Sequence, residues 1–185
     1  MRGLLTIFLF SFALFAQGCV KVDDDQGSGT KTDGKGEAST ELSSADGAEV
    51  GALKKHCSEI MSKQEHESAR IKVQRILIAF KGSVQGKEIG RNKEQAEKLA
   101  AEVFTKVQAG EDFDVLVRTH TDAPPPDFFY LHLTKHNPPS NHGRSALDEP
   151  SFGDVSWRLG IGEVGVAAYD PEKSKSGWHI IKRLE

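Results

Sequence analysis

This sequence has few cysteines, nearly balanced basic and acidic residues, and few long apolar stretches. Only two of the 185 residues are cysteine, so the chain lacks the set of several disulfides that stabilises many small secreted domains. Lysine and arginine number 24 against 27 aspartate and glutamate residues, which is not the basic footprint of a nucleic-acid-binding protein. No apolar run is long enough to cross a bilayer core of roughly 30 Å as a permanent helix. We therefore expect no nucleic-acid partner and no transmembrane helix.

The first residues have the three parts of a secretory signal peptide. Arg2 supplies a positive charge, residues 4–16 are almost unbroken in apolar character, and small residues precede Cys19. A basic start, an apolar stretch of about 7–15 residues and a small-residue cleavage site define such a peptide. We predict that residues 1–18 are removed and that the protein is exported.

Cys19 directly follows Gly18 at the end of the apolar run, an arrangement similar to a bacterial lipobox. In that motif the cysteine becomes the lipidated first residue of the mature chain, although Gln17 departs from the usual small residue. The resemblance implies a protein anchored in the cell envelope by acyl chains on Cys19 and facing the periplasm. The alternative is ordinary cleavage after Gly18, which leaves Cys19 as a thiol able to pair with Cys57.

Composition divides the mature chain into three parts. Residues 19–48 have almost no large apolar side chain and cannot bury enough surface to offset their ordering entropy, so we predict a flexible tether. Residues 49–71 have apolar side chains at three- and four-residue spacing, which predicts a helix that either packs on the domain or projects as a stalk. Residues 73–185 are the predicted folded domain.

Periodicity and turn residues predict short, alternating elements within this domain. Asn92 is a typical N-cap and Gly110 a typical stop for the longest helix, and a proline triplet ends the region after the next one. The predicted elements are, in order, a strand at 73–80, helices at 92–108 and from Phe113, a strand at 128–133, a helical turn at 152–159, and strands at 164–169 and 178–184. This order predicts an α+β fold with one small antiparallel sheet of about four strands and packed helices.

Three segments in this order resemble a parvulin-type (PpiC-like) peptidyl-prolyl isomerase domain, which has an FKBP-like superfold. Residues 75–78 (Arg-Ile-Leu-Ile) are similar to the family's His-Ile-Leu-Val strand. Residues 96–116, with Gly-Glu-Asp-Phe at 110–113, are similar to its long helix and following turn. Residues 159–164 and 176–183, which contain Gly-Glu-Val and Gly-Trp-His-Ile-Ile, are similar to its final strands. Between Thr121 and Phe152 the match fails, because a Pro- and His-rich insertion replaces the family's Gly-Gly-Asp-Leu-Gly run.

The resemblance implies isomerisation of X–Pro bonds in exported or unfolded proteins. The barrier to this rotation is ~18–20 kcal/mol, and an enzyme lowers it by binding the twisted amide better than either planar form. No bond breaks, so no metal or cofactor is needed. A non-catalytic chaperone that holds proline-containing segments is the main alternative, and an envelope scaffold that keeps only the fold is a third.

The resemblance also nominates an apolar socket for the prolyl ring. Phe152 matches the family's pocket phenylalanine, and Leu131 or Phe129 is expected to supply the other wall, with Trp157 beneath. The alternative is that all four are ordinary core residues, and for Trp157 that alternative is the favoured one.

The polar network around the rotating carbonyl departs from the family pattern. His179 matches the family's second histidine and Ser176 its hydroxyl residue, but Arg75 stands where the first histidine would be. Ala123 occupies the position of the family's cysteine or aspartate, with Asp122 beside it. A buried arginine needs a carboxylate, so we predict an Arg75–Asp122 ion pair next to His179. The alternatives are that Arg75 points to solvent and that His179 is a structural core histidine.

The histidines of the insertion do not predict a metal centre. His132 and His136 have the i,i+4 spacing of zinc ligands on a helix, but Pro138 and Pro139 argue against a helix there. No cysteine or carboxylate completes a ligand set, so we predict a solvated loop.

Overall fold

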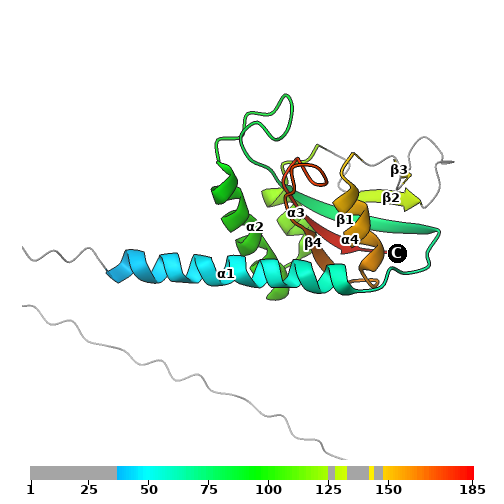
Figure 1. Ribbon diagram of the computed structural model, residues 1–185, viewed down its shortest axis with the longest axis horizontal. Helices are drawn as coiled ribbons and strands as arrows, with labels where there is room; N and C mark the ends of the chain where they lie inside the picture. Colours follow the sequence, from blue (N-terminus) through cyan, green and yellow to red (C-terminus); the bar gives the residue numbers. More distant parts are fainter. Residues whose placement is uncertain (1–36, 125–127, 133–141, 144–147) are drawn as a thin grey trace, which may run out of the picture. The chain divides into compact units, whose positions relative to one another are not determined.

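The computed structural model describes residues 37–124, 128–132, 142–143 and 148–185 of the chain. Within these ranges it contains four helices and five strands (Figure 1). They are α1 (Glu37–Ser62), β1 (Arg70–Ile78), α2 (Lys93–Gln108), α3 (Phe113–His120), β2 (Phe128–His132), β3 (His142–Gly143), α4 (Pro150–Arg158), β4 (Val164–Ala167) and β5 (Trp178–Arg183).

The strands form one sheet in the order β3-β2-β1-β5-β4. The pairs β2–β1, β1–β5 and β5–β4 are antiparallel, whereas the two-residue β3 runs parallel to β2. The predicted α+β class with a small, mainly antiparallel sheet is therefore confirmed, and β3 is an addition that the sequence did not indicate. Strand β1 lies at the centre because its apolar residues are buried on both faces.

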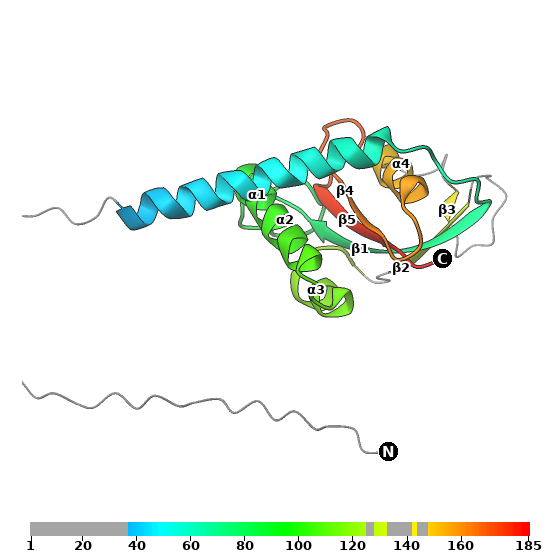
Figure 2. The same cartoon turned by 90° about the horizontal axis from the view of Figure 1, so that it is seen from below.

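The two faces of the sheet are covered by different helices. Successive strand residues point to opposite faces, so Ile76, Ile78 and Ile180 share one face and pack with residues of α2 and α3. Val73 and Ile181 share the other face and pack with residues of α4. Figure 2 shows α2 and α3 on one side of the strands and α4 on the other. Leu77 lies opposite His179 in the β1–β5 register, which places that histidine on the α4 face.

The start of α2 follows the sequence prediction closely. The side chain of Asn92 accepts a hydrogen bond from the backbone N–H of Gln95 at 2.8 Å, and the side-chain oxygen of Gln95 accepts one from the backbone N–H of Asn92. This reciprocal capping box satisfies two donors that a helix start otherwise leaves unpaired. The predicted cap and the predicted helix are both confirmed.

The predicted limits of the first helix, residues 49–71, are wrong at both ends. Helix α1 begins at Glu37, inside the stretch that we expected to be a flexible tether. A helix that is anchored further along the chain can continue into a segment without an apolar face, because adding a residue to an existing helix costs less than starting one. It ends at Ser62, and Ile71 belongs to β1. The intervening segment is held to α4, since Trp157 Nε1 donates to the carbonyl oxygen of Ser68 at 3.0 Å. The part of the predicted tether before residue 37 lies outside the described residues.

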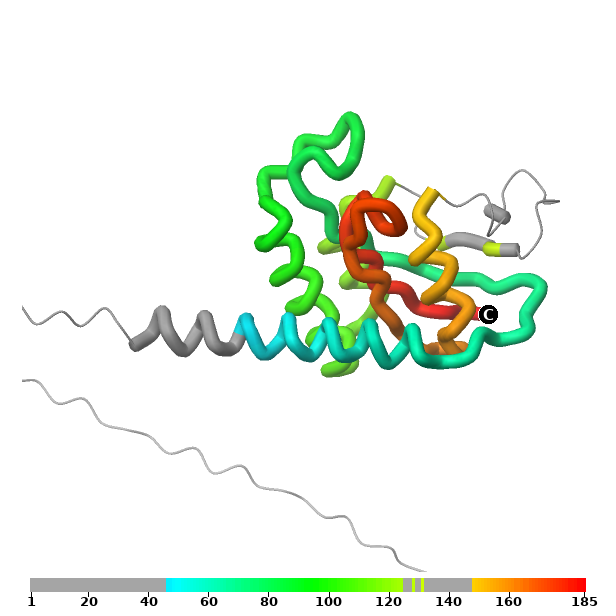
Figure 3. Tube along the Cα trace, viewed as in Figure 1, coloured from blue at the N-terminus to red at the C-terminus, as the bar shows by residue number. Residues whose placement is uncertain are grey.

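Of the two alternatives for this helix, the structure shows packing on the domain. Leu53 and Ile60 of α1 are each 1% exposed, and they belong to the apolar clusters on opposite faces of the sheet. Helix α1 therefore runs past the end strand β4, where His56 Nε2 lies 3.2 Å from the carbonyl oxygen of Val164 (Figure 3). None of the helices in the described ranges is long and apolar enough to cross a membrane.

Candidate active site

The centre of the α4 face brings together two of the residues predicted from the sequence. His179 of β5 is completely buried, and Phe152 in the first turn of α4 is 3% exposed. Their ring centroids lie 5.5 Å apart, with the planes inclined at 52°. The structure thus places an apolar ring directly beside the imidazole, with both side chains covered in this conformation.

Glu149 completes the polar part of this centre and was missed by the sequence analysis. It precedes α4, and its Oε2 atom lies 3.0 Å from Nε2 of His179, within hydrogen-bonding distance. Its Oε1 atom accepts the backbone N–H of Ser176 at 2.6 Å. The only local signal was an acidic residue directly before Pro150, which indicates a helix start and not a partner for a distant strand.

Arg75 lies inside the site and does not point to solvent. It is two residues from Leu77 on β1, so it shares the α4 face with His179. Its guanidinium carbon lies 5.6 Å from the centroid of the Phe152 ring. Burial lowers the pKa of Arg75, and the charge of Glu149 acts in the opposite direction. Glu149 is thus a negative charge that acts on this cation within the site.

The predicted Arg75–Asp122 pair is wrong. The carboxylate of Asp122 pairs with the guanidinium of Arg91 and accepts the backbone N–H of Ala79 at 2.9 Å. The backbone N–H of Asp122 bonds to the carbonyl oxygen of Leu77 at 2.8 Å, so the turn after α3 runs alongside the end of β1. This path presents the carboxylate to Arg91, whose Nε also donates to Ala79 at 2.7 Å. Asp122 fixes a turn and is not part of the His179 centre.

The ionisation of the centre follows from burial and from its charges. Burial lowers the pKa of His179, although contact with Glu149 opposes that shift. Burial alone would raise the pKa of Glu149, but its bonds to His179 and Ser176 outweigh this and lower it to about 2. At neutral pH we therefore assign an ionised Glu149 and a neutral His179.

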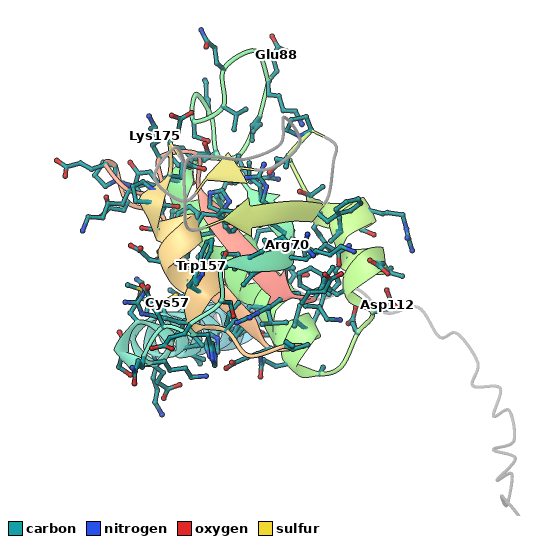
Figure 4. The ribbon with its side chains drawn as sticks, turned by 90° about the vertical axis from the view of Figure 1, so that its right-hand side faces the viewer. Cys57, Arg70, Glu88, Asp112, Trp157 and Lys175 are labelled. Carbon is teal, nitrogen blue, oxygen red and sulfur yellow. The ribbon has the colours of Figure 1, made fainter. Side chains whose placement is uncertain are left out.

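Two of the other predicted socket residues are buried, as Phe152 is. Leu131 and Trp157 are both 0% exposed and lie in the same core cluster as Phe152. Figure 4 labels Trp157 on α4. The core alternative therefore holds for these two residues. Phe129 lies opposite Val73 on β2, and its side chain is outside the described residues, as are Cys19 and the side chains of the insertion histidines. In the described part of the chain, no three His, Cys, Asp or Glu side chains gather to hold a metal ion.

Residues 56–185 match the family model of the PPIC-type PPIase domain. The chain belongs to this family, the parvulin-type peptidyl-prolyl isomerases. The matched region includes the last turns of α1, so the family domain begins earlier than the predicted residue 73. None of the curated proteins matches the chain.

Two solved structures are similar to this parvulin-type chain. One is the peptidyl-prolyl isomerase ESS1 from Candida albicans, with 19% identity over 73% of this chain and 74% of that chain and a TM-score of 0.48. The other is PrsA from Bacillus subtilis, with 20% identity over 80% of this chain and 49% of that chain and a TM-score of 0.38. The assignment of the parvulin-type domain rests on the family match and not on these likenesses.

Proposed function

We propose that this parvulin-type domain isomerises X–Pro bonds in exported or unfolded proteins at the centre formed by Phe152 and His179. The observation that carries the proposal is the contact between an apolar ring and a neutral, buried imidazole. The ring is suited to the prolyl side chain, and the imidazole and its neighbours form a dry polar environment for the rotating carbonyl. A ~10⁴-fold acceleration needs only about 5.4 kcal/mol of preferential binding to the twisted amide.

The burial of Phe152 favours weak activity. At 3% exposure its ring is nearly covered in this conformation, and His179 is fully covered. A prolyl ring can contact Phe152 only after neighbouring groups have moved aside. Part of the binding energy is then spent on this displacement and not on twisting the amide.

A non-catalytic chaperone that binds proline-containing segments is the second candidate. It is favoured by Arg75 and Ala123, which stand where the resemblance to the family leads us to expect a histidine and a cysteine or aspartate. An arginine keeps its charge and cannot act as a neutral hydrogen-bond partner, so a histidine pair cannot form.

The test is a protease-free isomerisation assay on residues 19–185 with proline-containing peptides. Acceleration that His179→Ala abolishes supports the isomerase. Peptide binding without acceleration selects the chaperone, and neither binding nor acceleration selects a scaffold. A fold check by circular dichroism on each variant ensures that a loss reflects the site and not unfolding.

We further propose that the mature protein is lipid-anchored through Cys19 in the cell envelope and faces the periplasm, where its clients are exported proteins. The support is the signal-peptide pattern of residues 1–18 and the lipobox-like position of the cysteine. Cys19→Ala should abolish labelling with radioactive palmitate and move the protein from the membrane to the soluble fraction of the envelope. Unchanged fractionation of a protein that takes up no palmitate would contradict the anchor.

A further inference from the structure

Three charged or titratable groups from three separate elements meet on the α4 face. Arg75 comes from β1, His179 from β5, and Glu149 from the segment that leads into α4. Glu149 is within hydrogen-bonding distance of His179, and its charge acts on Arg75. Its side chain is 14% exposed, so this carboxylate is shielded from most of the solvent.

The two hydrogen-bonding sites of Glu149 are directed at two donors. One oxygen accepts the backbone N–H of Ser176, a proton that cannot leave its nitrogen. The other oxygen lies 3.0 Å from Nε2 of His179, although the two do not form a hydrogen bond of good geometry. An ionised carboxylate can only accept, and it repels a nitrogen lone pair at this distance, so the proton is favoured on Nε2. The opposite ring nitrogen, Nδ1, is buried and has no hydrogen-bond partner among the described residues. It is therefore the atom of the imidazole that remains available as an acceptor.

The same carboxylate compensates for a substitution in the site. A partly buried guanidinium is costly unless a negative charge is close to it. Glu149 supplies that charge while Asp122 is paired with Arg91. Without Glu149, the cation at position 75 would act directly on the neighbouring imidazole, whose pKa it already lowers.

We propose that Glu149 is a positioning residue that holds His179 as the Nε2–H tautomer and balances the charge of Arg75. This inference rests on the proposed function, because it concerns the same site. It goes beyond that function in naming the group that sets the proton position of the histidine and permits an arginine at position 75. Glu149 acts through His179 and need not contact the substrate.

The decisive variant is Glu149→Gln. The carboxylate has two acceptor oxygens, one beside the backbone N–H of Ser176 and one beside the imidazole, whereas a glutamine has one acceptor oxygen and one donor NH₂. The backbone N–H of Ser176 cannot move its proton, so the amide oxygen should turn to it. The amide NH₂ then faces Nε2 of His179, and the imidazole should move its proton to Nδ1. Nitrogen chemical shifts of the imidazole, measured by NMR on labelled protein, report which nitrogen carries the proton without any need for turnover.

Glu163→Gln is the matched control. Its carboxylate also accepts a backbone N–H, that of Gly160 at 2.8 Å, and also pairs with a cation, Lys63. It lies in the turn before β4, and its contacts in the described part of the chain are with residues other than His179. We expect the wild type and Glu163→Gln to show a protonated Nε2, and Glu149→Gln to show a protonated Nδ1 with kcat lowered roughly tenfold, as when an orienting partner of a histidine is lost. A protonated Nε2 in Glu149→Gln, or an unprotonated one in the wild type, overturns the proposal.

A double-mutant cycle tests the balance of charge. Glu149→Gln should lower the urea midpoint of unfolding, and adding Arg75→Met should restore part of that loss because the unbalanced cation is removed. Strictly additive losses would overturn the charge-balancing role. If Glu149→Gln changes the tautomer but leaves kcat unchanged, the positioning role of Glu149 is supported. The same result would contradict the role of His179 in the proposed isomerase.

Discussion

The phenyl ring of Phe152 rests against the imidazole of His179, with 5.5 Å between their centroids. Because Phe152 belongs to α4 and His179 to β5, this contact joins the helix to the strand and also forms the centre of the proposed site. One side chain thus has a packing role and a binding role, and experiments on it must separate the two.

The first prediction separates these roles with two substitutions in the same helix. Phe152→Ala should lower the free energy of unfolding by about 3–5 kcal/mol because it leaves a cavity in the core. Phe152→Leu should cost only about 1–2 kcal/mol, yet should still abolish most of kcat/KM, since a flat ring is lost from the prolyl socket. Val155→Ala, at a residue 1% exposed in the same cluster, should cost a similar 1–3 kcal/mol without a change in kcat/KM. Equal effects of Phe152→Leu and Val155→Ala on kcat/KM would argue against the socket.

The second prediction concerns the turn before β5. A Cβ atom at Gly177 would lie 2.2 Å from the carbonyl oxygen of Ile78, and its φ is +140°. Gly177→Ala should therefore prevent folding or cost more than about 3 kcal/mol, because both backbone strain and a clash with β1 result. Gly82→Ala, where φ is +81° but nothing lies within 4 Å, should cost only about 1–2 kcal/mol. Urea unfolding followed by circular dichroism measures both, and similar values for the two variants would contradict the close approach.

The third prediction tests whether α1 belongs to the folded domain. Ile60 is 1% exposed and its neighbour Met61 is 45% exposed. Ile60→Ala should lower the free energy of unfolding by about 2–4 kcal/mol, whereas Met61→Ala should change it by less than about 1 kcal/mol. Thermal and urea unfolding give these values. A negligible effect of Ile60→Ala would mean that the helix is not an integral part of the core.

The fourth prediction follows from the ionisation of Glu149. Its pKa of about 2 in the folded protein lies below its usual value of 4.5, so folding favours the ionised form. The resulting stabilisation, on the order of 2–3 kcal/mol, is complete above pH 4.5 and is lost as the pH falls toward 2. The difference in free energy of unfolding between wild type and Glu149→Gln should therefore shrink over this interval. A difference that stays constant from pH 6 to pH 3 would argue that the carboxylate makes no special contacts.

Local patterns in the sequence predicted most of the fold, because each depends on neighbours along the chain. The capping signal at Asn92 and the strand predicted from Val73 are examples that the structure confirms. The limits of α1 were wrong because residues 37–48 have no apolar stripe, and helix there continues from a part of α1 that is packed on the sheet.

The polar centre was harder to predict, because its contacts join residues far apart in the sequence. Asp122 had two arginines as possible partners, and the path of the turn after α3 selects Arg91. Glu149 finds its partner Ser176 at a separation of 27 residues, and no periodicity or spacing rule connects them. The residues that carried the family resemblance, Phe152 and His179, were identified because the motif supplied this long-range information.

The position of α1 along β4 has a consequence for how a client protein can approach. An exposed border of a sheet offers unpaired amide groups, on which an unfolded segment can add itself as another strand. Here His56 and the apolar side chains of the helix lie along that border, so an unfolded segment is hindered from adding to β4 as another strand. A fragment that began after Ser62 would uncover the border, and its molecules would be expected to stick to one another.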